Sequence, residues 1–112
     1  MAARALLLAG REAEAESYLR SAYALQPSAM STLSLATLAA NRRDFATAIR
    51  LYLESLQLQP KAANTMYQLS LTYALAGDIV RARQYAQQAA ATQPDFPGLA
   101  EWMTQLRVPP AH

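Results

Sequence analysis

The sequence predicts a single all-α domain built as a stack of antiparallel helix pairs, and two observations support this. Alanine and leucine dominate the 112 residues, glycine occurs three times and β-branched residues are few, so intrinsic propensities favour helix along nearly the whole chain. In addition, the similar endings ALQP, QLQP and ATQP place prolines at positions 27, 60 and 94, at intervals of 33 and 34 residues. A repeat of this length has room for two helices and a turn.

The prolines divide the domain, residues 1–112, into a truncated first unit (1–27), two full units (28–60 and 61–94) and a terminal segment (95–112). Residues spaced i, i+4 and i+7 recur before each proline, which places them on one stripe of a second helix. These stripes are Ala15, Leu19 and Ala22; Ala48, Tyr52 and Ser55; and Ala82, Ala86 and Ala89. The two full units share a further stripe upstream, so each unit is predicted to contain two helices.

Polar residues and prolines mark where these helices begin and end. Asp44 and Asp78 are predicted to cap the second helices, because a carboxylate accepts the free amide hydrogens at a helix start. Ser28 is predicted to cap the helix that starts near Ala29. The unit-ending prolines stop the second helices, since proline has no amide hydrogen to donate.

The turn between the two helices of a unit contains glycine at Gly10 and Gly77, but the middle unit has Arg43 at that position. A left-handed conformation costs a residue with a side chain about 1 kcal/mol. We therefore expect the turn at Arg43 to be looser or differently shaped.

The predicted core has small residues where the helices cross and larger ones around them, because a bulky side chain at a crossing holds two axes apart. The small residues are Ala36, Ala48, Ser70 and Ala82, and the larger ones are Leu35, Phe45, Ile49, Tyr52, Leu56, Leu69, Tyr73 and Ile79. One unit is too thin to enclose a core, so each must stack on its neighbours. A last helix, starting at Pro97 and stopping before Pro109, is predicted to cover one end of the stack with Leu99, Met103 and Leu106.

The segments LSLATLAANRRDFATAIRLYLESLQLQP and MYQLSLTYALAGDIVRARQYAQQAAATQP together resemble the tetratricopeptide repeat, a helix–turn–helix unit of about 34 residues. The resemblance implies an α-solenoid of antiparallel helix pairs wound into a right-handed superhelix, with about three repeats and a C-terminal capping helix. The sequence departs from the family pattern at Thr32 and Met66, where each unit of the family has a large aromatic residue, and at Arg43.

Few residues are suited to catalysis, metal binding or nucleic-acid binding. Cysteine is absent and the sole histidine is His112, so neither a histidine-assisted nucleophile nor a multi-histidine metal site can be assembled within one chain. Glu12, Glu14 and Glu16 are interpreted as a solvated helix start, and the arginines near the two turns as solubility charges. We expect no enzyme activity, cofactor, metal, nucleic acid or membrane insertion. Cytoplasmic and periplasmic locations both stay open.

The resemblance implies that first helices line a concave groove, so groove residues are first-helix residues that the core does not use. They are Leu33, Ser34, Thr37, Asn41, Asn64, Tyr67, Gln68 and Leu71, with Trp102 on the terminal helix. Aromatic and leucine side chains among uncharged amides suit an extended or helical peptide. Alternatively, Tyr67 and Trp102 pack against each other or against the terminal helix. The lysines and arginines with which some tetratricopeptide domains hold C-terminal carboxylates are missing from α-helical positions such as Leu33 and Gln68, so an acidic tail is not the favoured ligand.

The sequence thus favours a non-catalytic protein–protein interaction module, a scaffold or adaptor that holds a partner's peptide or helical segment in the groove. The alternative is a self-assembly module, a homo-oligomer or an array of further repeats, that pairs through an uncovered N-terminal helix around ALLLAG. The resemblance suggests bacterial uses in secretion or envelope assembly, but no residue selects among them.

Overall fold

The structure is a computed structural model that describes residues 12–107, which form six helices and contain no strand. The helices are α2 (Glu12–Leu25), α3 (Ala29–Asn41), α4 (Phe45–Leu58), α5 (Ala63–Leu75), α6 (Ile79–Thr92) and α7 (Leu99–Leu106). The predicted all-α class is therefore confirmed. The expectations about Gly10 and the ALLLAG segment, and the residue Pro109, lie outside the described residues.

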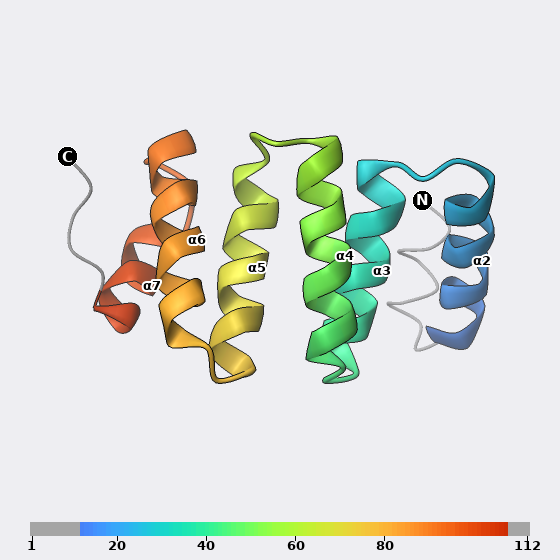
Figure 1. The fold of residues 1–112 in the computed structure, drawn as a ribbon, viewed down its shortest axis with the longest axis horizontal. Helices are drawn as coiled ribbons and strands as arrows, with labels where there is room; N and C mark the ends of the chain where they lie inside the picture. The colour runs from blue at the N-terminus through green and yellow to red at the C-terminus, as the bar shows by residue number, and fades with distance from the viewer. Residues whose placement is uncertain (1–11, 108–112) are drawn as a thin grey trace.

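The helices follow one another along the long axis of a molecule measuring 43 × 24 × 22 Å (Figure 1). Helix α3 packs most extensively on α4, and α5 on α6. The junctions α2 with α3, α4 with α5 and α6 with α7 join these pairs into one row (Figure 1). Packing that follows chain order in this way is typical of a helical repeat protein.

The predicted caps form at the helix starts. The Ser28 hydroxyl accepts a hydrogen bond from the Ser31 amide at 3.1 Å, and the Ser31 hydroxyl accepts one from the Ser28 amide at 3.1 Å, which completes a capping box. Asp44 accepts a hydrogen bond from the Thr47 amide, and Asp78 accepts one from the Arg81 amide. All three N-cap predictions are confirmed.

The turn at Arg43 has the same shape as the turn at Gly77, so the expectation of a different turn is wrong. Arg43 has φ of 63° and Gly77 has φ of 92°, both left-handed. The Asp44 amide donates to the Ala39 carbonyl at 2.9 Å, and the Asp78 amide donates to the Tyr73 carbonyl at 2.8 Å. The hydrogen bonds that close each helix end satisfy otherwise unpaired carbonyls, and this favours the left-handed residue even where it carries a side chain.

The small residues predicted at the helix crossings, Ala36, Ala48, Ser70 and Ala82, are fully buried. Among the larger predicted core residues, Leu35, Tyr52, Leu69 and Tyr73 are buried, and Phe45, Ile49 and Leu56 are half-buried. Except for Phe45, these larger residues belong to or pack against one continuous core, which also contains Leu19, Leu51, Met66 and the three alanines of the α6 stripe. The core therefore runs through the junctions between pairs as well as within them.

The sequence predicts a buried Ile79, and this prediction is wrong, because the side chain is 40% exposed. Phe45 occupies the same position in the preceding pair, directly after the capping aspartate. There the Arg43 guanidinium lies over the Phe45 ring at 5.6 Å from its centroid. In the next pair the corresponding residue is Gly77, which has no side chain to cover Ile79, so this isoleucine stays exposed beside the turn between α5 and α6.

Helix α7 closes the α6 end of the row. Leu99, Met103 and Leu106 are buried, as predicted. The helix begins at Leu99 rather than at Pro97, because the preceding Gly98 has a left-handed φ of 82°. The Arg83 side chain of α6 donates from Nε to the Leu106 carbonyl at 2.8 Å, which ties down the last turn of α7.

Candidate functional site

The nine residues predicted to line a groove lie on α3, α5 and α7. Seven are half-buried, namely Leu33, Ser34, Thr37, Tyr67, Gln68, Leu71 and Trp102, whereas Asn41 and Asn64 are exposed. On α3 and α5 they form a stripe beside the residues that enter the core. Their peptide-binding role stays a prediction.

Helices α3 and α5 contain no charged residue over their full lengths of 13 residues each. By contrast, α2, α4 and α6 each carry arginines, and α2 and α4 also carry glutamates. The surface that α3 and α5 contribute is therefore uncharged and partly apolar. A surface of this kind suits a partner segment with apolar side chains rather than a highly charged one.

The Thr37 side chain forms hydrogen bonds within α3 and with α4. Its hydroxyl donates to the Leu33 carbonyl at 3.0 Å and lies 3.2 Å from the hydroxyl of the buried Tyr52. Burial raises the pKa of Tyr52, and the hydrogen bond with Thr37 opposes that rise. Thr37 therefore joins α3 to α4, a role that sequence spacing alone could not reveal.

The two aromatic groove candidates contact different parts of the C-terminal end. The Tyr67 ring lies 5.2 Å from the Phe96 ring, centroid to centroid, at an interplanar angle of 44°. The Trp102 indole donates from Nε1 to the Ser70 hydroxyl at 2.8 Å, and Ser70 donates in turn to the Ala82 carbonyl at 2.6 Å. Each aromatic side chain therefore helps to hold the segment after α6 while part of its surface stays exposed.

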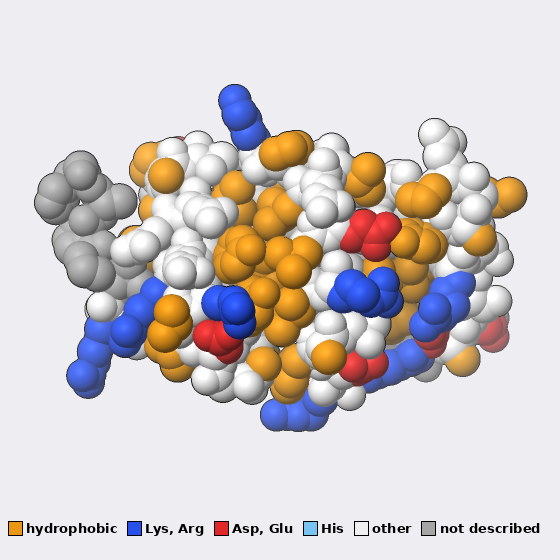
Figure 2. Space-filling view, in the orientation of Figure 1, with side chains coloured by type: hydrophobic (Ala, Val, Ile, Leu, Met, Phe, Trp, Pro, Cys, Tyr) orange, Lys and Arg blue, Asp and Glu red, His pale blue; other side chains and the backbone are white. Residues whose placement is uncertain are grey.

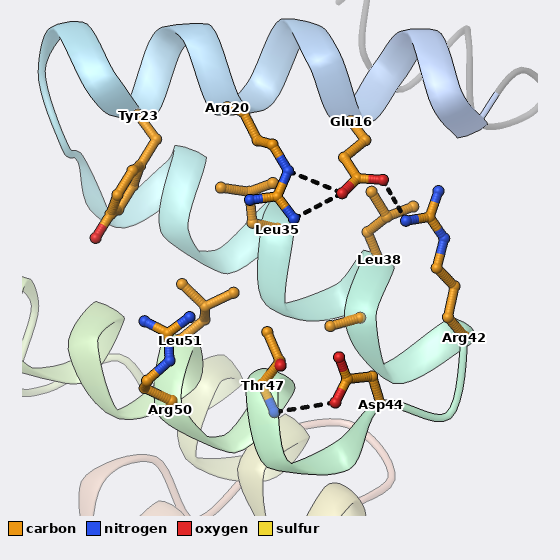
Figure 3. A pocket seen from close by; sticks show the side chains of 11 residues that line it. Glu16, Arg20, Tyr23, Leu35, Leu38, Arg42, Asp44, Thr47, Arg50 and Leu51 are labelled. Atoms are coloured by element: carbon orange, nitrogen blue, oxygen red, sulfur yellow. Dashed lines mark hydrogen bonds and ion pairs between the residues drawn. The ribbon is translucent and has the colours of Figure 1, made fainter.

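A separate pocket of about 220 Å³, which we call the junction pocket, lies where α2 meets α3 and α4 (Figure 3). Its lining residues are Glu16, Arg20, Tyr23, Leu35, Leu38, Ala39, Arg42, Asp44, Thr47, Arg50 and Leu51. None of these belongs to the predicted groove. In Figure 2, hydrophobic side chains lie between α4 and α2 with Lys or Arg side chains on both sides, and a wider hydrophobic band lies between α4 and α5.

Glu16 is the electrostatic centre of the junction pocket. Its carboxylate forms an ion pair with Arg42, the residue that follows α3, and accepts a hydrogen bond from Arg20 Nε at 2.8 Å (Figure 3). Hydrogen bonds from Arg42 and then Arg20 hold the pKa of Glu16 below its usual range. The sequence alone predicts a solvated Glu16 and a solubility charge at Arg42, because the two residues are far apart along the chain and no pattern links them.

Tyr23 and Arg50 border the other side of the junction pocket (Figure 3). The Tyr23 hydroxyl donates to the Glu54 carboxylate at 2.5 Å. This hydrogen bond raises the pKa of Tyr23, and the nearby positive charge of Arg50 opposes the rise. Among the residues that the structure describes, none forms a hydrogen bond or ion pair with the Arg50 guanidinium.

Within residues 12–107, no group of three or more His, Asp or Glu side chains is arranged to hold a metal ion. No helix in that range is long and apolar enough to cross a membrane. No known family model matches the chain, and no curated protein matches it. The tetratricopeptide resemblance therefore stands on the quoted residues and spacing.

Proposed function

We propose that this protein is a non-catalytic protein–protein interaction module of the tetratricopeptide type, a scaffold or adaptor. It binds a peptide or helical segment of its partner along α3 and α5. The observation that carries the proposal is the uncharged, half-buried stripe on these two helices. Leaving such surface exposed is unfavourable, and covering its apolar part with a partner segment gains about 25 cal/mol per Å².

The stripe offers both apolar contact and hydrogen bonding. Tyr67, Leu33 and Leu71 provide apolar area, while Gln68 and Asn64 provide amide donors and acceptors for a peptide backbone. Because the stripe has no charge of its own, a charged partner segment would lose hydration without gaining an ion pair. The preferred partner segment is therefore apolar on one face and contains few charges.

Two variants, each with two glutamate substitutions on one helix, test this proposal. In one variant Gln68 and Leu71 of α5 are replaced by glutamate, and in the control Gln87 and Gln88 of α6, both exposed, are replaced by glutamate. Each protein is immobilised and incubated with lysate of the source organism after circular dichroism has shown that it is folded. We expect the wild type and the control to capture the same partner and the α5 variant to lose it.

Capture of the same partner by all three proteins would refute binding along α5. If each protein captures only copies of itself, and sedimentation shows a mass that rises with concentration, the self-assembly alternative replaces the proposal. The control also guards against a general effect of added negative charge, since both variants place two glutamates on one helix.

A further inference from the structure

The junction pocket lies on helices and residues that the proposed partner-binding stripe does not use. Its walls come from α2, α3 and α4, and charged side chains surround an apolar floor (Figure 3). Leu35, Leu38 and Leu51 form that floor, and all three are buried. This combination of an apolar floor and a charged rim is a feature of small-molecule sites.

The rim of the pocket is charged. Three arginines line the pocket against two carboxylates, those of Glu16 and Asp44. Glu16 is already bound by Arg20 and Arg42, and Asp44 accepts the Thr47 amide hydrogen as the cap of α4. The Arg50 guanidinium donates no hydrogen bond to any other described residue. A planar guanidinium of this kind matches a carboxylate with two parallel hydrogen bonds.

The size of the pocket limits what can occupy it. A leucine-lined cavity of about 150 Å³ holds a benzene molecule. The junction pocket, at about 220 Å³, therefore has room for one leucine-sized group together with a carboxylate.

The charged residues of the junction pocket do not recur at the corresponding positions of the next junction. One repeat later, the positions of Glu16, Arg20 and Arg50 are occupied by Ile49, Leu53 and Gln84. Ile49 and Leu53 pack against the core there, and the position of Arg42 is occupied by Ala76. At the first junction Arg20 and Arg42 pair with Glu16, whereas Arg50 takes no part in that pairing.

We propose that the junction pocket binds a monocarboxylate whose carboxyl group is attached to an apolar group of about leucine size. The apolar group lies on the leucine floor, and the carboxylate pairs with Arg50. A phosphate dianion fits less well, because its second charge faces Glu16 and Asp44 with no further cation to balance it. Both the free carboxyl end of a peptide with a terminal leucine and a short-chain fatty acid have the required chemistry.

Chemical-shift titration of the isotope-labelled protein tests the proposal with four probes: N-acetyl-leucine, hexanoate, N-acetyl-leucinamide and inorganic phosphate. We expect saturable shifts of the Leu38 and Leu51 methyl groups and of the Arg50 Nε–H with the two carboxylates. The neutral amide and phosphate should produce no saturable shift at these groups. Tighter binding of N-acetyl-leucine than of hexanoate supports a peptide terminus as the natural ligand, and the reverse order supports a fatty acid.

Variants of exposed arginines separate a specific site from general attraction. Arg50→Gln should raise the Kd for the carboxylates by about tenfold, as expected for loss of a charge-assisted pair, and Arg50→Lys should raise it less. Arg81→Gln, on α6, should leave the Kd unchanged. The proposal is overturned if the amide or phosphate saturates the same groups equally well, if neither carboxylate saturates, or if Arg50→Gln binds like the wild type.

Discussion

Ser70 connects three helices, and its removal should destabilise the protein more than its size suggests. The residue is fully buried on α5, donates to the Ala82 carbonyl of α6 and accepts a hydrogen bond from the Trp102 indole of α7. Replacing Ser70 with alanine removes both bonds and leaves a half-buried indole N–H without its partner. At about 1 kcal/mol for each hydrogen bond, we expect the free energy of unfolding to fall by about 2 kcal/mol.

A double-mutant cycle isolates the contribution of the indole hydrogen bond. Trp102→Phe removes the donor and keeps an aromatic ring, so the pair Ser70→Ala and Trp102→Phe should cost about 1 kcal/mol less than the sum of the single changes. The reason is that no N–H is left unpaired in the double variant. The unfolding of all four proteins in urea is followed by far-ultraviolet circular dichroism. Tryptophan fluorescence is unsuitable, because Trp102 is the sole tryptophan and two of the four proteins lack it.

Ser34→Ala provides the control, because Ser34 is half-buried on α3 and has no side-chain hydrogen bond to another described residue. Its effect should stay within about 0.5 kcal/mol. The coupling between α5 and α7 would be refuted if the double variant lost as much unfolding free energy as the two single variants together, to within about 0.3 kcal/mol. A Ser70→Ala variant as stable as the wild type would show that the two hydrogen bonds make no net contribution.

Three further predictions follow from the turns, the core and the ion pairs. Gly77→Ala should lower the free energy of unfolding by about 1 kcal/mol, as measured by urea titration. An added Cβ meets no atom, but a φ of 92° is strained for any residue with a side chain. An unchanged urea midpoint would contradict this. Ile79→Lys should change the free energy of unfolding by no more than about 0.5 kcal/mol, because the side chain is exposed. Leu69→Ala, at a fully buried site, should lower it by about 2–5 kcal/mol. Equal losses in the two variants would indicate that Ile79 is buried after all. Glu16→Gln should lower the melting temperature at neutral pH, because the pKa of Glu16 is lower in the folded protein than its usual value of 4.5. The stabilisation is fully present above 4.5, declines as the pH falls below 4.5 and is lost once the pH is below the folded pKa. A difference that persists when Glu16 is protonated in both the folded and the unfolded protein would contradict this.

Sequence spacing predicted the helices and their starts because local rules control them. The caps at Ser28, Asp44 and Asp78 depend on neighbours within one turn. The predicted groove residues also lie on the helices expected to carry them. In each case the 3.6-residue period assigns a residue to a face without knowledge of its contacts.

Tertiary structure decided which polar side chains contact residues that are far away in the chain. Glu16 and Arg42 are 26 residues apart and read as separate surface charges, yet the packing of α2 on α3 joins them at the junction pocket. The Ser70 hydroxyl likewise reaches both α6 and α7. The sequence by itself determined the helices and their faces, since these follow from backbone sterics and local hydrogen bonds. Only the packed structure determined the pocket and its charged rim, because both depend on how side chains from three helices meet in space.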